Sequence, residues 1–201
     1  MAWPASFCAY LAAMQLPPLV LGSKSPRRQQ LLAAAGFRFR VQVQDVEEVW
    51  PPHLPLAEIP AYLARLKAEA LEPLSQDELV ITADTTVILG QQVLNKPTSA
   101  EEAIQMLLAL SGQCHTVVTG VHLRYRGRQT EFSAHTRVYF RPLELEEITQ
   151  YVAQSPPLDR AGAYGIQDTI GLRGIRRIEG DYYNVMGLPV CQLVEALQQY
   201  R

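Results

Sequence analysis

The run ELVITADTTVIL, residues 78–89, constrains the fold more than any other stretch of this chain. It is nearly continuous in the apolar and β-branched residues that buried strands favour, and it is interrupted at Asp84, Thr85 and Thr86. Thr85 and Thr86 lack the composition of a tight turn, and further strand-like sequence follows at once. A carboxylate here lies either at an exposed strand end or partly buried, where it needs a partner. We interpret Asp84 as a functional carboxylate that faces a cleft.

Strand and helix patterns alternate along the rest of the chain, which predicts a mixed α/β fold with long strands. The segment FRFRVQVQ (37–44) alternates strictly and predicts a half-buried strand with Phe37, Phe39, Val41 and Val43 on one face. The glycine-punctuated tail 161–189 is expected to be loop-like with short strands. Further strands are predicted at 19–21, 115–125 and 130–140, and helices from Pro26, from Pro60 or Ala61 (with the apolar stripe Leu63, Leu66, Ala70, Leu71 and Leu74), from a capping box of Ser99 and Glu102 to Leu110, near 143–153, and from Pro189.

The length of 201 residues suits one fair-sized domain or two small lobes. Residues 1–16 lack the features of a secretory signal or a membrane helix, so we expect a poorly specified extension and a single domain over 17–201, with Met14 as an alternative start. The net charge of −2 argues against non-specific nucleic-acid binding. Three widely spaced cysteines favour a reducing cytoplasm, and the four histidines lack zinc-site spacing.

The segment LGSKSPRRQQLLAAAG places two arginines at the start of a predicted helix. Ser25 is the expected N-cap and Pro26 the first helical residue. Arg27 and Arg28 then occupy the first turn, where the helix dipole already places partial positive charge. By this argument Arg28→Ala is expected to raise the stability of the unliganded protein slightly. The arrangement suits an anion, because helix N–H groups and arginines bind anions together.

Other charged residues also stand at unusual positions. Lys67 falls inside the apolar stripe of its helix, Lys96 precedes Pro97 after a predicted hairpin, and Glu48 lies in an acidic loop. Each alone is compatible with a solvated side chain. Four cations and two carboxylates together suit a polyphosphate with a divalent cation between phosphate and carboxylate. The set consists of Arg27, Arg28, Lys67, Lys96, Glu48 and Asp84.

Neither a Walker A nor a G-x-S-x-G pattern is present, so the sequence indicates neither a P-loop nucleotide hydrolase nor that kind of serine hydrolase. Six ordered motifs between Leu19 and about Leu197 instead resemble the Maf family of nucleoside triphosphate pyrophosphatases. They are LGSKSPRRQQLLAAAG, LARLKAEAL, ADTTVILGQQVLNKP, AIQMLLALSGQCHTVVTGV, AGAYGIQD and IEGDYYNVMGLP. The resemblance implies a fold related to the inosine triphosphate pyrophosphatases: a mixed twisted sheet with helices on both faces, and two lobes around a deep cleft.

The resemblance also implies hydrolysis of a nucleoside triphosphate to the monophosphate and pyrophosphate in the cytoplasm, with a divalent metal cation, Mg²⁺ or Mn²⁺. Asp84 matches the family's proposed general base; it either activates a water or holds the metal that does so, and Glu48 matches an acidic residue near the metal. Arg27, Thr85 and Gln167 match the specificity positions of the branch that prefers dTTP and UTP. The phosphate-binding set is matched by Ser23, Arg27, Arg28, Lys67 and Lys96.

Two alternatives stay open at this level. One is a non-catalytic nucleotide-binding regulator of cell division; the other is the same enzyme class acting on 7-methyl-GTP or modified nucleotides, against which Gln167 argues. Asp168, where the family commonly has glycine, adds negative charge beside the expected base pocket. Glu47, where aspartate is usual, is left out of the site. No nucleic-acid or membrane partner is expected, and a homodimer is left open.

Overall fold

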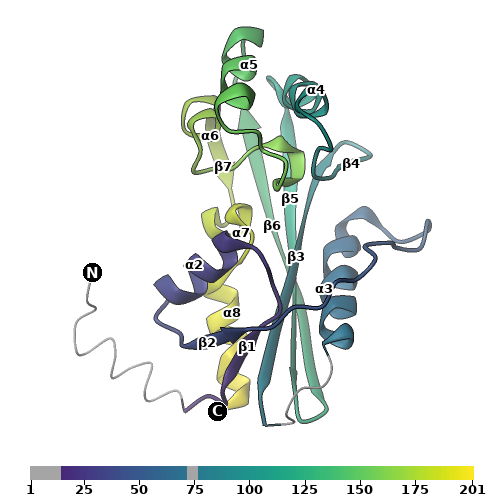
Figure 1. Cartoon of the computed structure of the whole chain (residues 1–201), viewed down its shortest axis with the longest axis vertical. Helices are drawn as coiled ribbons and strands as arrows, with labels where there is room; N and C mark the ends of the chain where they lie inside the picture. The colour runs from purple at the N-terminus through teal and green to yellow at the C-terminus, as the bar shows by residue number, and fades with distance from the viewer. Residues whose placement is uncertain (1–14, 72–76) are drawn as a thin grey trace.

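The computed structural model describes residues 15–71 and 77–201 (Figure 1). Its strands are β1 (Leu19–Leu21), β2 (Phe39–Val41), β3 (Leu79–Leu89), β4 (Gln92–Leu94), β5 (Cys114–Tyr125), β6 (Arg128–Phe140) and β7 (Ile175–Glu179). Within the described residues they form one seven-stranded sheet in the order β2-β1-β3-β5-β6-β7, with β4 paired to β3. β1 is parallel to β2 and β3, and the other pairs are antiparallel. The predicted mixed α/β class is confirmed.

Helices cover both faces of this sheet. They are α2 (Pro26–Ala34), α3 (Ile59–Ala70), α4 (Ala100–Leu110), α5 (Leu145–Gln154), α6 (Thr169–Gly174), α7 (Tyr182–Met186) and α8 (Val190–Leu197), with short 3₁₀ turns at Leu56–Glu58, Ala161–Ala163 and Gln198–Tyr200. In Figure 1, α3 lies on one side of the long strands and α2 and α8 lie on the other, while α4, α5 and α6 gather at the upper end.

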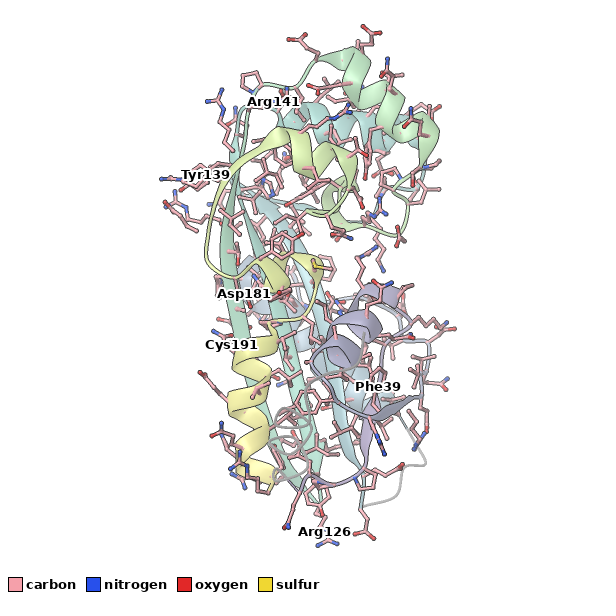
Figure 2. The ribbon with its side chains drawn as sticks, turned by 90° about the vertical axis from the view of Figure 1, so that its left-hand side faces the viewer. Phe39, Arg126, Tyr139, Arg141, Asp181 and Cys191 are labelled. Carbon is pink, nitrogen blue, oxygen red and sulfur yellow. The ribbon has the colours of Figure 1, made fainter. Side chains whose placement is uncertain are left out.

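The described residues form two hydrophobic clusters, one toward each end of the long strands. We call the part built on β1, α2 and α8 the lower lobe, and the part built on α4, α5 and α6 the upper lobe. Strand β3 belongs to both, because Ala83 packs in the lower cluster and Val87 in the upper one. Figure 2 places Arg126, in the β5–β6 turn, and Arg141, directly after β6, at opposite ends of the molecule. Asp84 therefore lies on a strand that spans both lobes, at the junction between them.

A glycine on β5 seats α3 against the sheet. A Cβ at Gly120 would lie 2.2 Å from the backbone nitrogen of Ala61 and 2.4 Å from its Cα, so a larger residue would push the start of α3 away. This close approach lets Lys67, farther along α3, reach Asp84 at the middle of β3. The packing of α3 thus brings one expected site residue to another.

The strand predicted at 37–44 is shorter than expected. Only Phe39–Val41 pairs with β1, and Val41 is 43% exposed although the alternation placed it on the buried face. Phe37 is buried, as predicted. β2 lies at the edge of the sheet, and after it the chain turns to line the cavity described below at Val43. The side chains beyond β2 therefore follow the course of a loop and not the alternation of a strand.

The other differences concern local detail. The tail predicted as loops with short strands contains α6 and α7, and the Asp181 side chain caps α7 by accepting from the Tyr183 backbone N–H at 2.8 Å. The Ser99 cap is present, but the Glu102 carboxylate accepts from Thr98 instead of closing the capping box. In α3 the buried positions are Ile59, Pro60, Ala61, Leu63, Ala64 and Ala68, whereas Leu66 and Ala70 of the predicted stripe are partly exposed and Leu74 lies outside the described residues.

Nearly all of the predicted extension, 1–16, also lies outside the described residues. Leu16, which is described, is partly buried against the lower cluster. Over the ranges 15–71 and 77–201, none of the helices has the length and apolar character that crossing a membrane requires.

Candidate active site

A cavity of about 380 Å³ lies between the two lobes, and every predicted site residue lines it. The turn from β1 to α2 and the first turn of α2 contribute serine and arginine side chains, and β3 contributes the carboxylate and threonine at its middle. α3 and the segments after β2, after β4 and before α6 complete the wall. The residues brought together are Ser23, Arg27, Arg28, Glu48, Lys67, Asp84, Thr85, Lys96 and Gln167.

Lys67 contacts two of the carboxylates that line this cavity, those of Asp84 and Glu48. Its Nζ lies 2.5 Å from Asp84 Oδ1 and 2.7 Å from Glu48 Oε1. The Lys67 and Asp84 side chains are only 17% and 12% exposed, whereas Glu48 is 45% exposed. Burial alone would raise the pKa of Glu48, but the hydrogen bond and charge of Lys67 lower it below its usual value. Lys67 thus compensates charge inside the cavity instead of extending into solvent.

The Asp84–Glu48 pair suits a divalent cation that also contacts a ligand. Both carboxylates contact the same ammonium group, so a single cation is within reach of both. Their oxygens are the ligand type that Mg²⁺ and Mn²⁺ prefer, and Mg²⁺ commonly takes one or two carboxylates together with substrate phosphates. Among the described residues, no three His, Cys, Asp or Glu side chains gather as a metal site by themselves. The residues present therefore fit an ion that shares its ligands with a phosphate.

Arg28 has a structural role that the sequence did not reveal. Its guanidinium donates to the Ala83 carbonyl at 2.8 Å, to the Gly187 carbonyl at 2.8 Å, to Thr85 Oγ1 at 2.9 Å and to Ser23 Oγ at 3.3 Å. Burial lowers the pKa of Arg28, although the nearby Asp84 charge opposes this effect. Arg28 thus ties the β1–α2 turn to β3 and to the end of α7. This reverses the expectation that removing Arg28 would stabilise the protein.

Arg27 is paired across the cavity. Its Nη1 donates to Asp159 Oδ2 at 2.8 Å, and its Nη2 donates to the Asp159 carbonyl at 3.1 Å. Asp159 stands in the loop between α5 and the Ala161–Ala163 turn, so the pair connects the two lobes. Burial acts to raise the pKa of Asp159, but the Arg27 hydrogen bond and charge lower it. Sequence reasoning missed Asp159, which no motif or periodicity distinguishes.

The negative charge expected at Asp168 is compensated. Arg160 Nη1 forms an ion pair with Asp168 Oδ2, and the Tyr151 hydroxyl donates to the same oxygen at 2.9 Å. Burial, followed by the nearby Asp168 charge, raises the pKa of Tyr151, which keeps this hydroxyl protonated. Gln167 beside it lines the cavity, and its Oε1 is buried without a hydrogen-bond partner in the described part of the chain. The neighbourhood of Gln167 is thus less negative than the sequence suggested.

A buried aromatic pair supports the upper wall of the cavity. His115 Nε2 lies 2.7 Å from the hydroxyl of Tyr164, which lines the cavity. Burial lowers the pKa of His115 to about 3, so its ring is neutral near pH 7. The tautomer of the neutral ring decides whether Nε2 donates to the Tyr164 hydroxyl or accepts from it. Phe140 stacks on the His115 ring and meets Tyr164 edge to face. The sequence did not reveal this contact between His115 and Tyr164, because the spacing of histidines indicates only whether they could bind a metal together.

Comparison with known proteins finds relatives along nearly the whole chain. The family model described as Maf-like protein matches residues 18–200. A dTTP/UTP pyrophosphatase of Cytophaga hutchinsonii is 47% identical over 181 residues, which make up 90% of this chain and 83% of that protein. Proteins of the same name from Phocaeicola vulgatus and Porphyromonas gingivalis are each 46% identical over 90% of this chain, covering 95% and 94% of their own lengths. The chain therefore belongs to the Maf family.

Proposed function

We propose that this protein hydrolyses dTTP and UTP to the nucleoside monophosphate and pyrophosphate. One observation carries the proposal: the interlobe cavity brings together the four cations and two carboxylates singled out in the sequence, among six cationic and four acidic side chains on its wall. A triphosphate with a divalent cation is a ligand whose charges complement this set. The names of the relatives, dTTP/UTP pyrophosphatases at 43–47% identity, support the choice of base. The cytoplasm, which holds the free nucleotide pool, is the compartment that this activity implies.

In the proposed reaction a water oxygen bonds to the α-phosphorus, and the bond from that phosphorus to the oxygen bridging to the β-phosphorus breaks, releasing pyrophosphate. Asp84 either accepts the proton of the attacking water or orients that water by holding the metal. Asp84 Oδ1 accepts a hydrogen bond from Lys67 Nζ at 2.5 Å, which orients the carboxylate on the cavity wall. Mg²⁺ or Mn²⁺ between Asp84, Glu48 and the phosphates would supply Lewis-acid chemistry. Arg27 and Lys96 would bind phosphate oxygens from the two lobes.

The nucleobase of the substrate is proposed to lie against the wall of the cavity that the upper lobe forms, beside Gln167. Gln167 offers both a carbonyl oxygen and an amide NH₂, which match the N3–H and a ring carbonyl of uracil or thymine. Its buried Oε1 lacks a partner among the described residues, which leaves an acceptor for the imide N–H once the amide turns toward a ligand. Thr85 Oγ1, fixed between Arg28 and Thr119, would add a hydroxyl contact. Guanine offers a similar pair in its N1–H and C6 carbonyl, so the proposed preference for a pyrimidine rests on the names of the relatives and not on these contacts.

The test is a substrate panel with purified protein and Mg²⁺. We expect kcat/KM to be highest for dTTP and UTP, lower for CTP, and lowest for 7-methyl-GTP, with pyrophosphate and not phosphate as the product. Preference for 7-methyl-GTP would move the protein to the other branch of the family. Nucleotide binding without any pyrophosphate release would instead favour the non-catalytic regulator.

A further inference from the structure

The ammonium group of Lys67 lies where the two candidate metal-binding carboxylates meet. Nζ is 2.5 Å from Asp84 and 2.7 Å from Glu48, and the lysine side chain is only 17% exposed. Each carboxylate therefore contacts the Lys67 ammonium group through one of its oxygens. A divalent ion placed between them would compete with Lys67 for those oxygens and would face its positive charge at close range.

The contacts of Lys67 leave its ammonium group able to move. Its partners are two side chains, and one of them, Glu48, stands in an exposed loop. Arg28, by contrast, is fixed by backbone carbonyls of Ala83 and Gly187 as well as by side chains. A lysine also carries its charge on a flexible four-carbon stem, so its ammonium can change partners without moving α3.

We propose that Lys67 is a built-in counter-ion that occupies the Asp84–Glu48 pair until a metal-bound triphosphate arrives, and that metal and nucleotide consequently bind as one unit. This inference rests on the proposed function. When the complex enters, the divalent ion takes the carboxylate oxygens, and the ammonium transfers its hydrogen bonds to phosphate oxygens in the same cavity. Without a phosphate, Lys67 would lose two anionic partners and gain none. The triphosphate therefore makes metal binding favourable, and by linkage the metal does the same for the triphosphate.

The experiment measures Mn²⁺ binding to the nucleotide-free protein, by the electron paramagnetic resonance signal of free Mn²⁺ during titration at pH 8. We expect Lys67→Met to bind Mn²⁺ at least tenfold more tightly than the wild type, because the carboxylate pair is vacated. Lys67→Arg retains a cation and should stay within threefold of the wild type. Lys96→Met is the matched control, since it removes the same charge from the same cavity but leaves the Lys67 contacts in place.

Equal tightening in Lys67→Met and Lys96→Met would overturn the proposal, because net charge alone would then explain the effect. Unchanged or weaker Mn²⁺ binding by Lys67→Met would overturn it as well. Should Lys67→Met fold poorly, the wild type provides a second test: a non-hydrolysable α,β-imido analogue of dUTP should bind at least tenfold more tightly with Mn²⁺ than without it. This gain should fall in Lys67→Gln, which removes the cation, and persist in Lys67→Arg, which keeps it. None of these measurements uses turnover, so failure of the proposed hydrolysis would be recognised separately.

Discussion

Arg27 and Asp159 connect the two lobes across the mouth of the cavity, with Arg27 Nη1 2.8 Å from Asp159 Oδ2. The arginine lies in the first turn of α2 in the lower lobe, and the aspartate follows α5 in the upper lobe. The pair is asymmetric in its exposure, because the Arg27 side chain is 19% exposed and the Asp159 side chain is 60% exposed. A substrate phosphate that approaches Arg27 must therefore compete with a carboxylate that the protein itself supplies.

Asp159→Asn is expected to lower the KM for dTTP about two- to fivefold, which corresponds to the roughly 0.4–1 kcal/mol of an exposed ion pair. The amide keeps the size of the side chain and one acceptor, while the charge that competes with phosphate is gone. Steady-state kinetics measure this, and Glu69→Gln, in the exposed Arg65–Glu69 pair of α3, is the control. A higher KM would show instead that Asp159 orients Arg27 for substrate.

Asp84→Asn should lower kcat by about 10²–10⁴-fold, the usual range for loss of a general base. The fold should persist, because the amide has nearly the same volume and Lys67 keeps its contact with Glu48. Asp45→Asn removes a carboxylate from the rim of the same cavity, where Asp45 pairs with Lys24 at 2.6 Å, and should change kcat less than threefold. Near wild-type turnover by Asp84→Asn would exclude both proposed roles of this residue.

Arg28→Ala should lower the free energy of unfolding by about 2–4 kcal/mol, because it strands the buried carbonyls of Ala83 and Gly187. This is opposite in sign to the result expected from the helix dipole alone. Urea denaturation of the nucleotide-free protein measures the change. Arg27→Ala, whose partner is largely exposed, should cost less than about 1 kcal/mol. Comparable losses in both variants would contradict the structural role of Arg28.

Gln167→Leu should reduce kcat/KM for dTTP by about 5- to 150-fold, since a buried unpaired polar group of the nucleobase costs about 1–3 kcal/mol. The matched control is Gln44→Leu, which changes another glutamine of the same cavity wall and should leave kcat/KM for dTTP unaltered. If Gln167→Leu also leaves it unaltered, the base is bound elsewhere.

The buried ring of His115 predicts a loss of stability in mild acid. Its pKa is about 3 in the folded protein, against 6.5 for a histidine exposed to water, so the unfolded chain binds the proton first. The contribution of the neutral His115 ring to the free energy of unfolding is complete above about pH 6.5. It falls by about 1.4 kcal/mol per pH unit as the pH decreases toward 3. Urea denaturation between pH 7 and 4 measures this slope, which His115→Gln should reduce. The exposed His135→Gln should not change it.

Much of the architecture could be predicted because its signals are local. Ser25 and Pro26 start α2 through their own backbone preferences, and the apolar run at 78–89 forms β3 because both of its faces are covered by helices and hydrophobic clusters. The short α6 and α7 were not predicted, since glycines and few apolar positions give them no helical period. Their formation depends on packing against strands and helices already in place.

The fold class, the family and nine of the residues that line the cavity follow from the amino-acid sequence, because motifs and hydrophobic periods are properties of neighbouring residues. How those residues pair depends on the folded chain. Lys67 contacts Asp84 and Glu48, Arg27 contacts Asp159, and Arg28 is held by the backbone of distant segments. Such contacts join positions far apart along the chain, and their energies depend on burial and on the distance between charges. Those two quantities are set only when the lobes come together.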